Sequence, residues 1–428
     1  MHRPFPFWNF HRVRTVASIV PLVLGTVTLG SASAYTLNTL HSFCTQADCS
    51  DGGFPRAGLV KDSAGNLYGT ASTGGEGHAG IVFKLVPNAN GSKYKEHVLY
   101  SFCSAANCTD GKAPFSDLIL DVDGRLYGTT LEGGNNNNGV VFQLSHSGNG
   151  SVETVIHTFC AQQGCADGDR PPFGLSYAGQ QSGAPWDEFS PLFGAAGGGK
   201  YGHGIDYELT SDGSLWNFSI IHDFQSSSDP NELLIDSSGN IFGTTNSRGK
   251  YGGGLLYKLT SGTWKETVFH NFCKLANCVD GRFPVGRLAV DSSGNLFGTT
   301  SRGGANDGGV VFRRGTGGTT SVLYSFCSQA NCQDGSTPAG GVAMKGSGSL
   351  LGLTEGGGSN FGGVAFKLAN KNGAWTESVL YSFCSKTDCA DGIQPTGEPI
   401  LDSSGDLFGA TTGGGVNGDH GTVFELTP

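Results

Sequence analysis

Twelve cysteines stand in the chain, and all of them fall into pairs separated by four residues. The six Cys-x4-Cys pairs are Cys44/Cys49, Cys103/Cys108, Cys160/Cys165, Cys273/Cys278, Cys327/Cys332 and Cys384/Cys389. An even number of cysteines at regular spacing predicts a disulfide framework. A related stretch at residues 221–224 lacks both cysteines together, which favours pairing within each loop, because pairing between loops would leave one cysteine alone.

Paired cysteines are also typical of zinc sites, which need four ligands at compatible spacing. No histidine stands at a fixed distance from these pairs. We therefore expect disulfides, and we predict neither a metal ion nor a cofactor.

An Asp-Gly pair follows each cysteine loop, and its aspartates are Asp51, Asp110, Asp167, Asp280, Asp334 and Asp391. Six carboxylates near one face would suit cations or hydroxyl-rich ligands. Asp-Gly is also ordinary turn chemistry, because Asp accepts nearby backbone hydrogen bonds and Gly adopts a positive φ. The turn is the favoured interpretation, with a ring of ligand groups as its alternative.

The third repeat carries nine extra residues, around residues 178–190. An exposed Trp186 beside Asp187 and Glu188 would suit stacking on a sugar or on a protein partner. The competing interpretation is a longer hairpin without a ligand role, since loop insertions are well tolerated.

The fourth repeat is seven residues shorter in its cysteine loop, which predicts a notch beside two glycine-rich loops. Loops of varied sequence on a regular frame are typical of recognition surfaces. With the insertion, these loops give the candidate ligand-binding residues Trp186, Asp187, Glu188, Lys200, Tyr201, His203, Lys250 and Tyr251.

Enzyme motifs are weak. Two G-x-G-x-x-G matches, at residues 197–202 and 413–418, do not open a helix after a parallel strand. Neither H-E-x-x-H nor G-x-S-x-G occurs. We therefore predict no catalytic residues.

These residues belong to a sequence repeat of about 57 residues that occurs seven times. This period is typical of β-propellers. The repeats lie near residues 40–98, 99–155, 156–220, 221–268, 269–322, 323–379 and 380–428. Each repeat contains four short strands, expected in the second repeat at residues 115–121, 125–130, 140–144 and 151–159. Gly-containing turns that start at Asp236, Asp291 and Asp402 predict tight hairpins.

The sequence thus predicts an all-β, seven-bladed propeller of four-stranded antiparallel blades over residues 35–428. Its first strand, near residues 36–43, is expected to pair with the last, near 421–426, so that no sheet edge stays free. The cysteine loops and glycine loops then share one face of the ring. Tyr94, Trp216, Trp264 and Trp375 occupy one register position, where packing is expected.

Residues 1–34 resemble a secretory signal peptide. Arg3, Arg12 and Arg14 precede an apolar run at residues 16–30, and an Ala-Ser-Ala site follows at 32–34. A membrane anchor is disfavoured because the run is short. Cleavage takes the formal net charge from −10 to −13, which argues against nucleic acid as a partner.

The chain resembles the GloVer tandem-repeat proteins, whose members differ in their carboxy-terminal anchors. The motifs that carry this resemblance are Ser325-Phe326-Cys327 with Cys332, Asp334-Gly335 and Pro338, then residues 291–300 and 308–312. The resemblance implies a secreted, propeller-like bacterial repeat protein and transfers no catalytic residue. Because no apolar tail follows the last strand, we expect a freely secreted or periplasmic product.

We therefore predict an exported monomer that acts as a non-enzymatic binding module for a protein or glycan ligand, without a membrane span after signal cleavage. An extracellular carbohydrate-active hydrolase or lyase is one alternative. A structural envelope protein is another.

Overall fold

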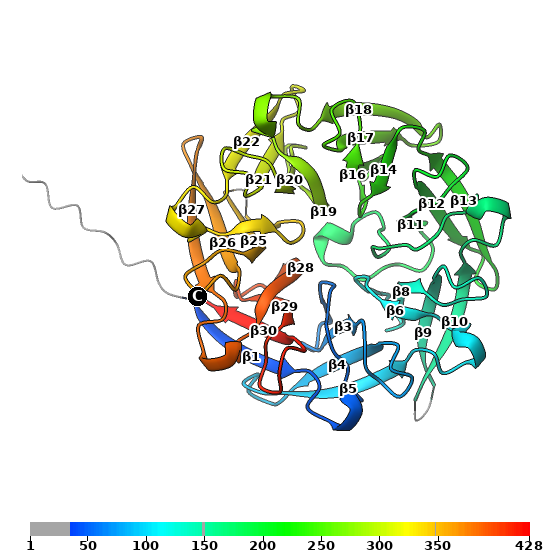
Figure 1. Cartoon of the computed structure of the whole chain (residues 1–428). Helices are drawn as coiled ribbons and strands as arrows, with labels where there is room; N and C mark the ends of the chain where they lie inside the picture. Colours follow the sequence, from blue (N-terminus) through cyan, green and yellow to red (C-terminus); the bar gives the residue numbers. More distant parts are fainter. Residues whose placement is uncertain (1–34, 148–149, 347) are drawn as a thin grey trace, which may run out of the picture. The chain divides into compact units, whose positions relative to one another are not determined.

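A computed structural model describes residues 35–147, 150–346 and 348–428. The described residues form seven antiparallel sheets around one axis, as a seven-bladed β-propeller (Figure 1). The predicted fold class is confirmed. The signal peptide predicted at residues 1–34 lies outside the described residues and stays a prediction.

Each blade runs from an innermost strand at the axis to an outermost strand at the rim. Blades 1 and 2 consist of β2 (Val60–Lys61), β3 (Leu67–Ala71), β4 (Ile81–Pro87) and β5 (Tyr94–Ser101), and of β6 (Lys112–Pro114) with β7 (Ile119–Leu120), β8 (Leu126–Glu132), β9 (Val140–Ser147) and β10 (Gly150–Thr158). Blades 3 and 4 consist of β11 (Leu192–Ala196), β12 (Ile205–Ser211) and β13 (Trp216–Asp223), and of β14 (Ser227–Pro230) with β15 (Leu234–Ile235), β16 (Ile241–Arg248), β17 (Leu255–Thr260) and β18 (Lys265–Asn271). Blades 5 and 6 consist of β19 (Arg282–Val290), β20 (Leu296–Arg302), β21 (Val310–Arg314) and β22 (Thr320–Ser325), and of β23 (Ser336–Pro338) with β24 (Ala343–Lys345), β25 (Ser349–Gly356), β26 (Val364–Lys371) and β27 (Ala374–Ser382). Blade 7 consists of β28 (Ile393–Leu401), β29 (Leu407–Gly413), β30 (Thr422–Thr427) and β1 (Thr36–Ser42).

Short 3-10 turns complete the secondary structure of the described residues. They are η1 (Ala47–Cys49), η2 (Ala106–Cys108), η3 (Gln163–Cys165), η4 (Gln180–Ser182), η5 (Ala276–Cys278), η6 (Ala330–Cys332) and η7 (Thr387–Cys389). Among the described residues, no helix is long and apolar enough to cross a membrane.

The innermost strand is less regular than the sequence predicts. In blade 2 only β7 falls within the strand expected at residues 115–121. β6 precedes that range, and both short strands pair with β8. In blade 3 this segment pairs with its neighbour through the isolated bridges Asp169–Gly197 and Ser176–Phe193. The interruption falls where the chain passes the axis, so side chains at that point are free to face one another across the ring.

The predicted hairpin turns are confirmed. The Asp236 carboxylate accepts hydrogen bonds of 2.9 Å from the backbone N–H groups of Ser238 and Asn240. Gly239 takes the left-handed conformation that closes the turn, with φ at 76°. Asp291 and Asp402 make the same pair of contacts.

Neighbouring blades are joined by a repeated aromatic contact. At the end of each outermost strand a buried Phe packs edge-to-face on an aromatic ring of the next blade, with ring centres 4.9–5.5 Å apart. The seven pairs are Phe43–Phe83, Phe102–Phe142, Phe159–Tyr207, Phe224–Tyr257, Phe272–Phe312, Phe326–Phe366 and Phe383–Phe424. Edge-to-face pairs stabilise by about 0.5–1.5 kcal/mol beyond burial, so the ring is fastened at every seam.

A proline from the next blade makes a second packing contact between blades. In blade 6, Gly363 has φ at 92°, and a Cβ there would lie 2.6 Å from Cδ of Pro395 in blade 7. The Gln394 N–H donates a 2.9 Å hydrogen bond to the Gly362 carbonyl. The close approach of two backbones explains why this loop ends in glycine.

The ring closes as predicted. β1 pairs antiparallel with β30, and the register runs from Thr36↔Thr427 to Ser42↔Thr422. The beginning and the end of the described chain therefore share blade 7 (Figure 1).

Candidate functional site

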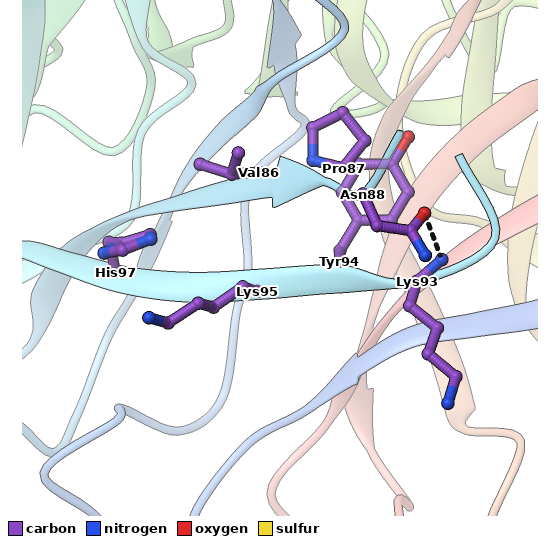
Figure 2. Close-up of a pocket in the computed structure, with 7 residues that line it drawn as sticks. All are labelled: Val86, Pro87, Asn88, Lys93, Tyr94, Lys95 and His97. Carbon is purple, nitrogen blue, oxygen red and sulfur yellow. Dashed lines mark hydrogen bonds between the residues drawn. The ribbon is translucent and has the colours of Figure 1, made fainter. Parts of the chain in front are cut away.

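A hollow of about 300 Å³ lies against the β4–β5 hairpin of blade 1 (Figure 2). Its lining residues are Val86, Pro87, Asn88, Lys93, Tyr94, Lys95 and His97. Tyr94 also packs against the hydrophobic core, and so do Trp216, Trp264 and Trp375, which confirms the packing predicted for this position. None of the predicted ligand residues lines this hollow.

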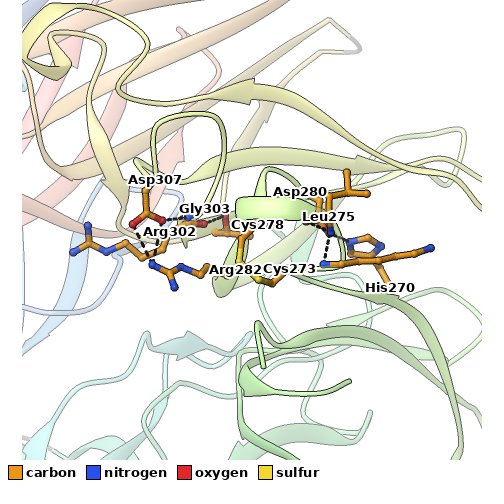
Figure 3. Close-up of a disulfide and its surroundings, with 11 residues drawn as sticks. His270, Cys273, Leu275, Cys278, Asp280, Arg282, Arg302, Gly303 and Asp307 are labelled. Carbon is orange, nitrogen blue, oxygen red and sulfur yellow. Dashed lines mark hydrogen bonds and ion pairs between the residues drawn. A yellow bond between two sulfur atoms is a disulfide. The ribbon is translucent and has the colours of Figure 1, made fainter. Parts of the chain in front are cut away.

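All six cysteine pairs form disulfides within their own loops, as predicted. In the loop that Figure 3 shows, Cys273, Asn277 and Cys278 have φ of 61°, 57° and 52°. Asn, Asp and Gly tolerate this left-handed conformation best, and one of them precedes the second cysteine in every loop. The loop sequence and the disulfide thus specify the same tight turn.

The Asp of each Asp-Gly pair holds its cysteine loop from inside. Asp280 accepts hydrogen bonds of 3.0 and 3.1 Å from the N–H groups of Lys274 and Leu275, and its carboxylate lies 3.2 Å from Nε2 of His270 (Figure 3). All six aspartates are buried. These contacts favour the turn interpretation over a ring of ligand groups.

Hydrogen bonding also sets the acidity of two of these groups. Burial by itself raises the pKa of Asp334, but hydrogen bonds from Tyr324 and Ser328 outweigh it and the net shift is downward. Asp391 is shifted downward for the same reasons. Both carboxylates are thus charged acceptors.

The blade 3 insertion does not present the exposed tryptophan that the sequence predicts. Trp186 is only 2% exposed, and its Nε1 donates a 3.0 Å hydrogen bond to the Ser190 carbonyl. Asp187 accepts bonds from the Phe189 and Ser190 N–H groups, and Glu188 pairs with Arg125. That expectation of exposure is wrong because the indole packs edge-to-face on Tyr127, in the core.

The insertion also reaches across the axis. Gln181, in η4 of blade 3, bonds to the Leu288 carbonyl at 3.5 Å and to the Val290 N–H at 3.4 Å, both in β19 of blade 5. The insertion of blade 3 therefore contacts the innermost strand of blade 5 directly, without blade 4 between them.

The other predicted residues lie at the opposite end of β11. Lys200, Tyr201 and His203 follow that strand, and Lys250 with Tyr251 occupies the same place in blade 4. The structure links the two loops, because Arg248 Nη1 donates a 2.9 Å hydrogen bond to Nδ1 of His203. The eight predicted residues thus form two groups and not one site. Trp186, Asp187 and Glu188 precede β11, whereas the other five residues follow β11 or β16.

The connection between blades 3 and 4, where the sequence predicts a notch, is short. Residues 224–226 separate β13 from β14, whereas residues 272–281 separate β18 from β19. The blade 3 to blade 4 connection therefore lacks the cysteine turn that covers other seams.

A second cluster, which the sequence analysis missed, lies at the axis. Arg287 in β19 donates hydrogen bonds of 3.2 Å to Glu232 and 2.9 Å to Glu398, from blades 4 and 7. Asp117 of blade 2 accepts a bond from the Gly58 N–H of blade 1. The four charged side chains come from four blades, so the cluster exists only in the closed ring.

Three carboxyl groups share one guanidinium in this cluster. Burial raises the pKa of Glu232 to about 8, and Asp117 and Glu398 add to the shift although Arg287 opposes it. Burial also raises the pKa of Asp117 and of Glu398. Burial thus favours the protonated forms of these carboxyl groups, and Arg287 offsets only part of this effect.

A comparison of repeats would have revealed this cluster. The same innermost-strand position holds glycine in three blades and a charged residue in four. In blade order the residues are Gly58, Asp117, Gly174, Glu232, Arg287, Gly341 and Glu398. Glycine there allows backbones to approach, since a Cβ at Gly341 would lie 2.5 Å from the Arg287 carbonyl oxygen.

Solved structures share the fold at low sequence identity. An oligogalacturonate lyase from Vibrio parahaemolyticus is 8% identical, with a TM-score of 0.51 over 92% of this chain and 97% of that chain. A puromycin hydrolase variant is 13% identical, with a TM-score of 0.44 over 84% of this chain, which spans half the length of the hydrolase. TolB from Acinetobacter baumannii is 11% identical, with a TM-score of 0.41 over 87% and 79% of the two chains.

No curated protein matches the sequence. Among protein families, the Gloeobacter/Verrucomicrobia repeat matches residues 23–186 and 173–342. These two segments cover most of the propeller, including five of the six cysteine loops and the glycine loops that follow β11 and β16. The chain belongs to the Gloeobacter/Verrucomicrobia repeat family.

Proposed function

We propose that the protein is a non-enzymatic module that binds an anionic polysaccharide through the glycine loops of blades 3 and 4. One observation carries the proposal: both loops present the tetrapeptide Gly-Lys-Tyr-Gly, at residues 199–202 and 249–252, in neighbouring blades. We call these two loops the twin loops.

The twin loops are built alike. In each, the second glycine N–H bonds to the carbonyl of the first, at 3.1 Å from Gly202 and 3.4 Å from Gly252. The Lys200 N–H is held by Asp223 at 3.1 Å, and the Lys250 N–H by Asn271 at 2.9 Å. Two turns of one geometry offer two copies of one contact, which suits a ligand with a repeating unit.

The exposed groups fit a charged sugar. Tyr201 and Tyr251 are 44% and 41% exposed, and an aromatic face packs on the apolar face of a sugar ring. The ammonium groups of Lys200 and Lys250 lie 5.4 and 5.5 Å from those ring centres. Cations beside aromatic faces would pair with the carboxylates of a uronic acid polymer.

The positive charge is local. The whole chain is acidic, at −10, while Lys200, Arg248 and Lys250 gather at the twin loops. The Arg248 guanidinium lies 2.9 Å from Nδ1 of His203, which keeps its positive charge between the two loops. Local charge on an acidic protein favours an anionic ligand at this one surface.

Binding of polygalacturonate oligosaccharides tests the proposal by calorimetry. We expect Lys200→Ala with Lys250→Ala to weaken binding at least tenfold, and Tyr201→Ala to weaken it by a similar factor. Asn360→Ala in the equivalent loop of blade 6 is the matched control and should bind normally. Dextran, a neutral polysaccharide, serves as a second ligand. Equal affinity for dextran and polygalacturonate, or no effect of the lysine variants, would refute the proposal.

We also propose export. Six disulfides are typical of oxidising compartments such as the periplasm or the extracellular medium. Amino-terminal sequencing of the exported protein should begin at Tyr35. An intact segment at residues 16–30 would contradict it.

The axial cluster supports a second candidate, a hydrolase or lyase. Asp117, Glu232 and Glu398 are odd-one-out polar residues at inward positions, and carboxyl groups of raised pKa serve as general acids. A polysaccharide-degradation screen tests this candidate. Activity that Asp117→Asn abolishes would favour the enzyme, and inactivity of the wild-type protein would favour the binding module.

A further inference from the structure

Six of the seven seams between blades repeat a set of three positions, and the seam of blades 3 and 4 lacks the Asp-Gly pair. The first lies on an outermost strand, two residues before the buried Phe, and the second is the Asp of the Asp-Gly pair. The third lies on the outermost strand of the next blade. Four of the seams hold Tyr100/Asp110/Glu153, Tyr324/Asp334/Glu377, His157/Asp167/Phe218 and His41/Asp51/Glu96.

The seam between blades 7 and 1 combines His41, Asp51 and Glu96. One potential ligand atom from each side chain lies within 4.8 Å of the others. His41 is on β1, Glu96 is on β5, and Asp51 lies in the connection between blades 7 and 1. The set therefore joins the strand that closes the ring to the first blade.

Two atoms of this set are buried and lack a partner. His41 Nε2 and Glu96 Oε1 make no hydrogen bond. They lie 3.9 Å apart, and the two side chains are 13% and 7% exposed. This distance is too long for a direct hydrogen bond, so neither atom satisfies the other.

We propose that His41, Asp51 and Glu96 bind a divalent transition-metal ion, with Zn²⁺ as the best-fitting ion. One imidazole and two carboxylates are suitable ligands for such ions. Bonds of about 2.0–2.2 Å place neighbouring ligand atoms roughly 3.4 Å apart. The three ligand atoms, which lie within 4.8 Å of one another, would have to move closer together to bind one ion.

Asp51 is already positioned for this role. Its Oδ2 accepts a 2.7 Å hydrogen bond from the Thr45 N–H, and its Oδ1 accepts one of 3.3 Å from the Gln46 N–H. Hydrogen bonds from the second shell orient ligating carboxylates in metal sites. The cysteine loop thus fixes one ligand in advance.

Other seams show what fills the space without a metal. At the next seam, the Tyr100 hydroxyl donates a 2.8 Å hydrogen bond to Asp110. At the following seam, Phe218 replaces the Glu and stacks on His157, with ring centres 3.7 Å apart. Each of these seams thus contains an aromatic ring. Buried atoms without a partner remain in both, Asp110 Oδ1 with Glu153 Oε1 in the first and His157 Nε2 in the second. Of the three seams, only that of blades 7 and 1 combines such an imidazole nitrogen with such a carboxylate oxygen.

Metal titration of the purified, chelator-treated protein tests the proposal. Calorimetry with Zn²⁺ should show one equivalent bound, and Co²⁺ should give the visible absorption of a nitrogen- and oxygen-ligated site. The variant His41→Tyr supplies the residue that three other seams contain, so it should fold and lose that equivalent. Far-UV circular dichroism checks the fold.

The reciprocal variant sharpens the test. Tyr100→His places the same three residue types at the next seam, beside Asp110 and Glu153, and should raise the stoichiometry from one to two. His157→Tyr, at the seam with Phe218, is the matched control and should leave it at one. Zinc binding that His41→Tyr and Glu96→Gln both leave unchanged, or no binding by the wild-type protein, would overturn the proposal.

Discussion

Three carboxyl groups at the axis share the positive charge of Arg287, and this shortage of charge makes stability depend on pH. Glu232 has a pKa of about 8 in the folded protein, above its ordinary 4.5. Its protonated form is favoured by folding, so its contribution is complete below pH 4.5 and is lost as the pH rises through 8. The free energy of unfolding should fall by up to about 1.4 kcal/mol per pH unit in this window.

Urea unfolding at pH 6 and pH 9 measures this effect. Glu232→Gln keeps a neutral acceptor for Arg287 and should reduce the loss of stability between pH 6 and pH 9. Part of the loss should remain, because burial also raises the pKa of Glu96, Glu153 and Asp206 to about 8. Glu76→Gln, in an exposed loop, changes the net charge equally and should keep the wild-type slope. Equal slopes for the wild type and Glu232→Gln would show that Glu232 is ionised in the folded state.

At the residue scale, the sequence predicted local chemistry better than it predicted exposure. The cysteine pairs follow from their spacing and from joint loss in one repeat. Trp186 could not be placed from sequence, because its burial depends on Tyr127, about sixty residues earlier. The axial cluster was missed for a similar reason: its members are far apart in the sequence and become neighbours only around the ring.

At the element scale, the junction of blades 6 and 7 explains a glycine that a single repeat does not. A Cβ at Gly363 would clash with the Thr354 carbonyl and with Pro395 of the next blade. Gly373 has a similar φ of 88°, but nothing lies within 4 Å of its Cβ position. The two positions therefore separate backbone strain from steric conflict between blades.

We expect Gly373→Ala to cost about 1–2 kcal/mol, the price of a left-handed alanine. Gly363→Ala should cost at least about 1 kcal/mol more, because the clash forces the blades apart. Urea unfolding of both variants checks this ranking. Equal losses of unfolding free energy in the two variants would mean that the contacts around Gly363 adjust to the added methyl group without further destabilisation.

Hairpin turns and strand pairing were predictable because their signals are local. The Asp-x-x-Gly turns and alternating strands each need only a few adjacent residues. The innermost strand was predicted less well. In blade 2 the chain is already bent within β6, where Ala113 has φ at 54° and donates a hydrogen bond to the Ala79 carbonyl of the previous blade. That contact depends on the neighbouring blade and not on adjacent residues.

At the scale of the whole molecule, stability depends on β1. Deletion of residues 35–42 would expose the edge of β30 and remove Leu40 from the hydrophobic core. We expect it to lower the free energy of unfolding by at least about 3 kcal/mol.

A permuted chain that begins at Phe43 and carries residues 35–42 after Pro428 should recover most of this loss, because Thr36 and Thr427 are paired. Calorimetric unfolding compares the three proteins, and an unchanged midpoint after the deletion would contradict closure by β1.

The pairing of β1 with β30 also sets an order of events during synthesis. β1 is synthesised first among the described strands but cannot pair until β30 is made, since Thr36 and Thr427 lie 391 positions apart. Six blades can assemble while the seventh has only its outer strand. Bringing such distant segments together is slow, so the final seam is where a nascent chain stays vulnerable to proteases and to pairing with a second molecule.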